Sequence, residues 1–252
     1  MCKSDKLGLN IIDITSKTER YENSQFLLKE NPLYKPEILA IKLEDVIFDV
    51  NYSYLESIKQ SYYYFTGKQI SLAQINEAKA LGGYCDNCAL IKYLVEQYGF
   101  NFAYEDIVSK FKEIYWNDGQ GHINQEQLLV EKSLLNKLST DYRLVALTQD
   151  TLQEATFKLC LHSVEHYFTK IIASDSVSTG NIIKKTKIEM NSEKILLIGS
   201  SIDDMKLAVS ENVPAIAICD SKELQLIEIL NNNGAHDVLP NLDRLPDILS
   251  VL

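Results

Sequence analysis

Short apolar runs alternate with helix-like segments over the second half of the chain. The runs begin at residues 143, 170, 194, 214 and 236, and each is bounded by polar or turn-forming residues. Between them, apolar side chains recur every three or four positions, which is the spacing of an amphipathic helix. Short apolar strands that alternate with helices are typical of a parallel sheet covered on both faces. We therefore predict an α/β fold built on a parallel sheet.

The first apolar run, ILAIKLEDVIFDV, occupies residues 38–50 and is separated from the others by a helical block. Segments with helical spacing begin at residues 52, 71, 88 and 104, with no strand-like run between them. A further helix is predicted over residues 126–139. Ligands of such sheets bind beyond the carboxyl ends of the strands. We therefore expect the helical block to be an inserted cap over that edge.

The pattern divides the chain into three parts. Residues 1–36 are polar, show no sustained periodicity and end in a proline-punctuated stretch, so they are predicted to be an N-terminal extension. Residues 37–54 and 124–252 are predicted to form the α/β core, with a Rossmann-like parallel sheet. Residues 55–123 are predicted to form an all-helical cap domain.

Composition and charge narrow the class of protein. Of 252 residues, 46% are hydrophobic and 24% charged, which is ordinary for a folded globular protein. The net charge of −10 disfavours nucleic-acid and anionic membrane partners. No apolar run approaches the length of a membrane span, the first ten residues lack the apolar core of a signal peptide, and the five scattered cysteines suit a reducing compartment. We expect a cytoplasmic protein.

Polar residues at the predicted strand ends carry a resemblance to a known superfamily. They are Lys42, Glu44, Thr148 and the segment GSSIDD at residues 199–204. In this order along a capped α/β fold, they resemble the haloacid dehalogenase-like (HAD) phosphatases. The stretch LLIGSSIDDMKLA is similar to the family's fourth motif, GDxxxD, and RLVALTQDTLQEA is similar to the second motif with its single Thr. The resemblance covers residues 37–252 and implies the same fold and cap.

The resemblance also implies a chemistry, from which this chain departs. In the family an aspartate attacks phosphorus, a second aspartate two residues later handles the leaving-group proton, and acidic residues of the fourth motif help to bind Mg²⁺. By spacing, Lys42 falls on the nucleophile, Glu44 on the acid/base and Ser200 on the first aspartate of the fourth motif. The family's phosphate-binding lysine, expected near Ser178 and Thr179, has no clear match.

The predicted pocket is therefore degenerate. A Lys at position 42 places a cation where Mg²⁺ belongs, and Glu44, Asp203 or Asp204 could neutralise it, which predicts an ion-pair cluster with weak or no Mg²⁺ binding. The competing interpretation is that these residues are merely tolerated at the rim of a cleft. The members of the predicted pocket are Lys42, Glu44, Thr148, Gly199, Ser200, Asp203 and Asp204.

Two functional hypotheses follow. The first is a HAD-like pseudoenzyme that lacks the nucleophilic aspartate, needs no cofactor or metal, and acts by binding an unidentified protein partner or a small anionic ligand. The alternative is a divergent phosphomonoester hydrolase that acts on a phosphorylated small metabolite with Mg²⁺. In that alternative VIFDVNYS is the first motif and Asp49 the nucleophile, although this register leaves no residues for the loop ahead of the cap helix. The sequence leaves open whether the protein is an enzyme.

Overall fold

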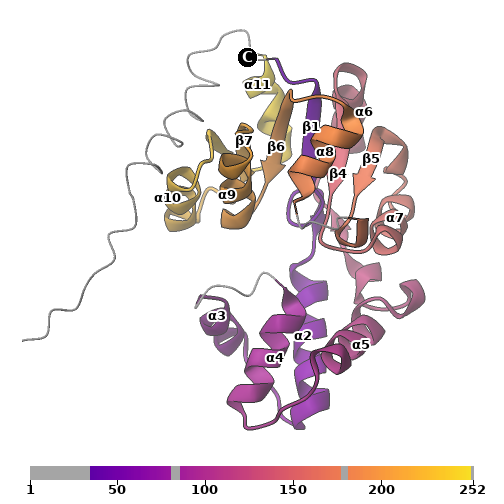
Figure 1. Cartoon of the computed structure of the whole chain (residues 1–252), viewed down its shortest axis with the longest axis vertical. Coiled ribbons are helices and arrows are strands. Elements are labelled where there is room, and N and C mark those ends of the chain that lie inside the picture. Colours follow the sequence, from indigo (N-terminus) through magenta and orange to yellow (C-terminus); the bar gives the residue numbers. More distant parts are fainter. Residues whose placement is uncertain (1–34, 81–85, 177–180, 251–252) are drawn as a thin grey trace, which may run out of the picture.

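A six-stranded parallel sheet forms the centre of the larger part of the molecule (Figure 1). The computed structural model describes residues 35–80, 86–176 and 181–250. All neighbouring strands in the sheet pair in parallel, as the alternation of strands and helices predicts. In sheet order the strands are β5 (Phe168–Ile172), β4 (Arg143–Leu147), β1 (Ile38–Lys42), β6 (Ile195–Gly199), β7 (Ala215–Ile218) and β8 (Asp237–Leu239).

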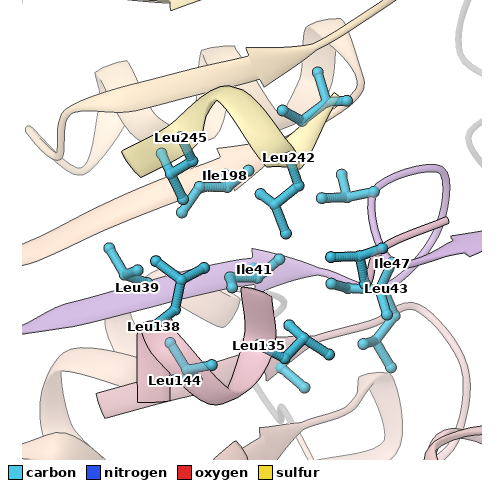
Figure 2. Packing of buried hydrophobic residues seen from close by; sticks show 14 of the residues in the cluster. Leu39, Ile41, Leu43, Ile47, Leu135, Leu138, Leu144, Ile198, Leu242 and Leu245 are labelled. Carbon is cyan, nitrogen blue, oxygen red and sulfur yellow. The ribbon is translucent and has the colours of Figure 1, made fainter. Parts of the chain in front are cut away.

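Helices cover both faces of this sheet. Alternate residues of a strand point to opposite faces, so Leu39 and Ile41 join one apolar cluster while Ile38 and Ala40 join another. Figure 2 shows Leu39 and Ile41 in the first cluster, together with Leu138 of α6. That cluster includes residues of α6 (Lys132–Asp141), α7 (Leu152–Leu161) and α11 (Leu245–Leu249). The opposite cluster includes residues of α8 (Ile182–Met190), α9 (Ile202–Ser210) and α10 (Leu224–Asn232).

A separate group of helices lies beyond the carboxyl ends of the strands (Figure 1). It has its own apolar core, in which Ile58, Leu90 and Ile107 are fully buried. Its first helix begins at Asn51, so the predicted boundary between residues 54 and 55 falls inside a continuous helix. We call this group the helical cap; it consists of α2 (Asn51–Thr66), α3 (Leu72–Ala80), α4 (Asn87–Gln97) and α5 (Tyr104–Tyr115).

A short antiparallel ribbon joins the cap to the core. It pairs β2 (Phe48–Asp49) with β3 (Gln127–Leu128). The helix predicted over residues 126–139 is therefore wrong at its start, because α6 begins only at Lys132. The apolar residues ahead of α6 suit a helix locally, but pairing with a strand distant in sequence gives them an extended backbone. The remaining short helices are η1 (Asn117–Gly119), η2 (His122–Gln125), η3 (Glu165–Tyr167), η4 (Ser174–Ser176) and η5 (Leu242–Arg244).

Some sequence predictions fall outside this description. The N-terminal extension is described only at residues 35 and 36, and Ser178 and Thr179, near which the phosphate-binding lysine was expected, lie outside the described residues. Among the helices of the described ranges, none combines the length and apolar character needed to cross a membrane.

Candidate functional site at the end of β1

Lys42 is the last residue of β1, and its side chain meets Glu44 beyond the strand end. Lys42 Nζ lies 3.3 Å from Glu44 Oε2, and both residues are more than nine-tenths buried. Burial opposes the charge on Lys42, but the carboxylates of Glu44, Asp204 and Asp150 outweigh it and raise its pKa. The residue at the spacing of the family's nucleophile is therefore a charged ammonium group.

The turn after Glu44 has the backbone of a glycine-containing motif. Asp45 has a φ of 57°. This left-handed conformation is one that glycine adopts freely, while Asp is among the few other residues that tolerate it. The amide of Asp45 donates to the carbonyl of Phe48, and the amide of Phe48 donates to the carbonyl of Leu43, which closes the turn. The chain therefore makes a tight turn directly after Glu44, with Asp45 in the conformation that glycine favours.

Glu44 is held by the neighbouring strand. Its Oε1 accepts hydrogen bonds from the hydroxyl of Thr148 and, at 3.0 Å, from the amide of Gln149. Burial opposes ionisation of Glu44, but the ammonium groups of Lys42 and Lys158 and the Thr148 hydroxyl outweigh it and lower its pKa to about 2. Glu44 is therefore ionised at any physiological pH.

The loop after β6 completes the site. Ser200 Oγ donates to the carbonyl oxygen of Glu44 over 3.2 Å. Asp204 Oδ2 accepts from the amides of Ser200 and Ser201, at 3.1 and 3.0 Å, and from the Ser201 hydroxyl at 2.7 Å. This carboxylate is consequently engaged as the capping box of α9. Asp203, one residue earlier, is exposed at the start of the same helix.

Gly199 makes this close approach possible. A Cβ atom on Gly199 would lie 2.6 Å from Asp204 Cβ, closer than such atoms pack. The absence of a side chain therefore lets Asp204 fold back over the end of β6.

Asp49, the nucleophile of the alternative register, lies elsewhere. It belongs to β2 and pairs with Gln127 in the ribbon between core and cap. Its Oδ1 accepts from both the backbone amide and the side-chain amide of Asn51, each at 3.0 Å. The residue that ends β1 beside Thr148 is Lys42, and Asp49 serves the turn into α2.

The residues at the end of β1 do not fit Mg²⁺. This ion takes oxygen ligands in a strict octahedral arrangement. Here the Lys42 ammonium and the Ser200 hydroxyl lie at the strand end, and Glu44 and Asp204 already accept several hydrogen bonds. Within residues 35–80, 86–176 and 181–250, no group of three or more His, Cys, Asp or Glu side chains is arranged to hold a metal ion.

A cleft of about 440 Å³ lies between the cap and the core. Of its described lining residues, Asp86, Asp150 and Glu154 carry carboxylates, while Lys112 is the one that carries an ammonium group. The Lys158 ammonium lies behind Asp150, 2.6 Å from its Oδ2. The charge of this wall therefore disfavours entry of a phosphate dianion.

Sequence reasoning missed a buried ion cluster next to the site. It consists of Glu126, Asp150 and Lys158, all of which are more than nine-tenths buried. Lys158 and Asp150 both act electrostatically on groups at the end of β1, as the pKa values of Glu44 and Lys42 show. The available signal was a lysine within the apolar pattern ATFKLCL of α7, where a surface lysine would break the buried face.

The parallel sheet, the capping helices and the ribbon together define a HAD-like phosphatase-type fold, as comparison with solved structures shows. A phosphatase described as predicted, from Clostridium acetobutylicum, has a TM-score of 0.67 at 20% identity and covers 86% of this chain and 100% of its own. A predicted phosphoglycolate phosphatase from Haemophilus somnus has a TM-score of 0.70 at 13% identity, with 86% and 99% covered.

A third structure gives the same result. It is a haloacid dehalogenase-like family hydrolase from Streptococcus pneumoniae, with a TM-score of 0.66 at 16% identity and coverage of 84% of this chain and 98% of its own. No family model and no curated protein matches the sequence. Likeness at these identities concerns the fold, and the chemistry must be argued from this chain's own residues.

Proposed function

We propose that this protein is a pseudoenzyme, which keeps the phosphatase-type fold but acts by binding rather than by phosphoryl transfer. The observation that carries the proposal is the buried Lys42–Glu44 ion pair, 3.3 Å long, at the end of β1. A protonated ammonium group has no lone pair with which to attack phosphorus, and the pKa of Lys42 is raised. No phospho-aspartate can form at this position.

Glu44, at the second position of the motif, also argues against phosphoryl transfer. A general acid must be protonated at the working pH in order to give its proton to a leaving group. The pKa of Glu44 is lowered to about 2, so this carboxyl holds no proton to give near neutral pH. Both steps that the family divides between two aspartates therefore lack a suitable group here.

Of the two kinds of ligand that the sequence allows, a protein partner has the better support. The carboxylates that line the cleft disfavour a small anion. On the cap, Tyr63 and Tyr64 of α2 are 56% and 61% exposed. Aromatic side chains are enriched at protein interfaces, and these two tyrosines keep more than half of their surface exposed although Tyr64 also contacts Lys110 and Phe65 within the cap.

The test is an activity assay on the purified protein. A panel of phosphate monoesters is offered with and without Mg²⁺, and the expected result is no metal-dependent turnover. Asp49→Asn is assayed beside the natural sequence, because Asp49 is the nucleophile of the divergent-hydrolase alternative. Turnover that requires Mg²⁺ and disappears in Asp49→Asn would overturn the proposal. Calorimetric titration of the protein with inorganic phosphate tests whether it binds a small anion. Detectable binding of phosphate would favour the small anionic ligand over the protein partner.

A further inference from the structure

Two stretches of chain connect the cap to the core, and they run side by side. The outgoing stretch is β2 followed by α2, and the returning stretch is η2 followed by β3. Pairing of β2 with β3 places these stretches next to each other. Glu126 lies between η2 and β3, at the point where the returning chain enters the core. Any rotation of the cap on the core must bend the chain at this point.

A lysine of the core forms an ion pair with this connection. Lys158, in the last turn of α7, places its Nζ 3.0 Å from Glu126 Oε2 and 2.6 Å from Asp150 Oδ2. The side chains of Lys158 and Glu126 are each 1% exposed. The same ammonium lies 5.5 Å from the centre of the Phe48 ring in β2, so it contacts both connecting stretches.

Hydroxyl groups of the cap donate hydrogen bonds to the two carboxylates that Lys158 contacts. Glu126 Oε1 accepts hydrogen bonds from Ser53 Oγ at 2.7 Å and from Tyr115 Oη at 3.0 Å. Asp150 Oδ1 accepts from Tyr54 Oη at 3.1 Å. Ser53 and Tyr54 belong to α2 and Tyr115 to α5. Each carboxylate is thus shared between the core ammonium and hydroxyl groups of the cap.

Movement of the cap would separate these partners. An ion pair removed from water is strongly unfavourable once one partner is lost, because the remaining charge is then uncompensated. Burial opposes the charge on Lys158, but Asp150, Glu126 and Glu44 outweigh it and raise its pKa, so the ammonium stays charged. Opening of the connection would therefore separate Glu126 from Lys158, and the buried ammonium would keep Asp150 of the core but lose the carboxylate of the connection.

We propose that Glu126, Asp150 and Lys158 form a clamp that fixes the cap in one orientation on the core, so that the two parts move as one body. The clamp goes beyond the proposed function, since it would hold the cap whether or not the site at the end of β1 is active. It predicts that the cleft between cap and core keeps one width instead of opening and closing.

The single tryptophan of the sequence reports on this contact. Trp116, at the end of α5, packs edge-to-face on Phe157 of α7, with ring centroids 5.2 Å apart. Phe157 is the neighbour of Lys158 in the sequence. Fluorescence of Trp116 therefore measures contact between cap and core, whereas far-ultraviolet circular dichroism measures the helices of both parts.

The experiment compares the full-length natural sequence with Lys158→Met during urea unfolding. In the natural protein the fluorescence and circular dichroism transitions are expected to coincide. In Lys158→Met the emission of Trp116 is expected to shift to longer wavelength, its quenching by acrylamide to increase, and its transition to precede that of the helices. Lys170→Met is the matched control, because Lys170 is half exposed and pairs with Glu189 on the surface.

Two outcomes would overturn the clamp when Lys158→Met folds. The first is a natural protein whose two transitions already separate, since the cap would then move independently. The second is a folded Lys158→Met protein whose quenching and transitions equal those of Lys170→Met. If Lys158→Met does not fold, Glu126→Gln is measured in its place. This substitution removes the charge at the connection but keeps a side-chain oxygen that accepts hydrogen bonds from Ser53 and Tyr115. Unchanged quenching in Glu126→Gln would then refute the clamp.

Discussion

The Lys42 ammonium lies 3.3 Å from the Glu44 carboxylate, and both are buried at the end of the central strand. The pair neutralises itself within the site, with Thr148 and Gln149 donating to the remaining carboxylate oxygen. A phosphatase-type fold places its metal-binding carboxylates at this edge of the sheet, according to the resemblance. In this chain the Lys42 ammonium lies at that edge and pairs with Glu44.

Replacing Lys42 and Ser200, which fall on aspartates of the family's motifs, with aspartate should make the stability of the fold depend on a bound cation. The variant carries Lys42→Asp and Ser200→Asp together, so that new carboxylates join Glu44 and Asp204. Without Mg²⁺ these like charges should destabilise the fold, and with Mg²⁺ the loss should be reversed. A metal present at about 100 times its dissociation constant stabilises a protein by about 2.7 kcal/mol. Calorimetry and thermal unfolding with and without Mg²⁺ measure both effects.

The natural sequence is the control for this prediction. Its thermal unfolding should not respond to millimolar Mg²⁺ beyond the response to an equal ionic strength of NaCl. A natural protein that Mg²⁺ stabilises as strongly as it does the double variant would contradict the assignment of Lys42 to the metal's place.

Glu44 should make the protein less stable in acid. Its pKa is about 2 in the folded protein against an ordinary value of 4.5. The unfolded chain takes up the proton first, so the contribution of Glu44 is fully present above pH 4.5 and is lost as the pH falls towards 2. Urea unfolding at several pH values between 5 and 3 should show a shallower decline in Glu44→Gln than in the natural protein.

Glu126 provides a control of opposite sign. Burial raises its pKa above the ordinary 4.5, although Lys158 opposes the shift. Its contribution to stability is therefore present below pH 4.5 and is lost as the pH rises through the folded-state value. Glu126→Gln should remove that loss and leave the acid decline due to Glu44 in place. An equal acid slope in Glu44→Gln and the natural protein would show that Glu44 is not held as described.

Gly199 should not tolerate a side chain. In Gly199→Ala the new Cβ meets Asp204 Cβ at 2.6 Å, so the capping carboxylate must move. Overpacking of this kind costs about 1–3 kcal/mol of unfolding free energy, measurable by urea titration. The effect should shrink when the substitution is made in an Asp204→Gly background, because the clashing Cβ is then absent. An equal cost in both backgrounds would place the strain elsewhere.

The sheet was largely predictable because its signal is local. Each central strand is a short apolar run, as in LLIG before Ser200, and each such run needs helices on both sides to bury it. The ribbon of β2 and β3 was not predictable. Its two-residue strands have no periodicity of their own, and their pairing brings together segments that lie on either side of the whole cap.

Spacing along the chain located site residues only where the end of a strand could also be recognised in the sequence. Lys42 and Glu44 could be placed because a strand end followed by a glycine-like turn aligns with the family's first motif, and Thr148 because it directly follows another strand. The cluster of Glu126, Asp150 and Lys158 could not be placed. Its members come from a connection, a loop and a helix, and although Lys158 stands out within an apolar pattern, nothing in the sequence indicates which carboxylates lie beside it.

The sequence by itself determined the class of fold and the residues that end the central strand, since these depend on residue type and local pattern. Only the tertiary structure decided that Glu44 pairs with Lys42, that Asp204 caps a helix, and that Lys158 pairs with Glu126. The physical reason is that a buried charge is acceptable only beside its partner, and packing of distant segments, not spacing along the chain, supplies that partner.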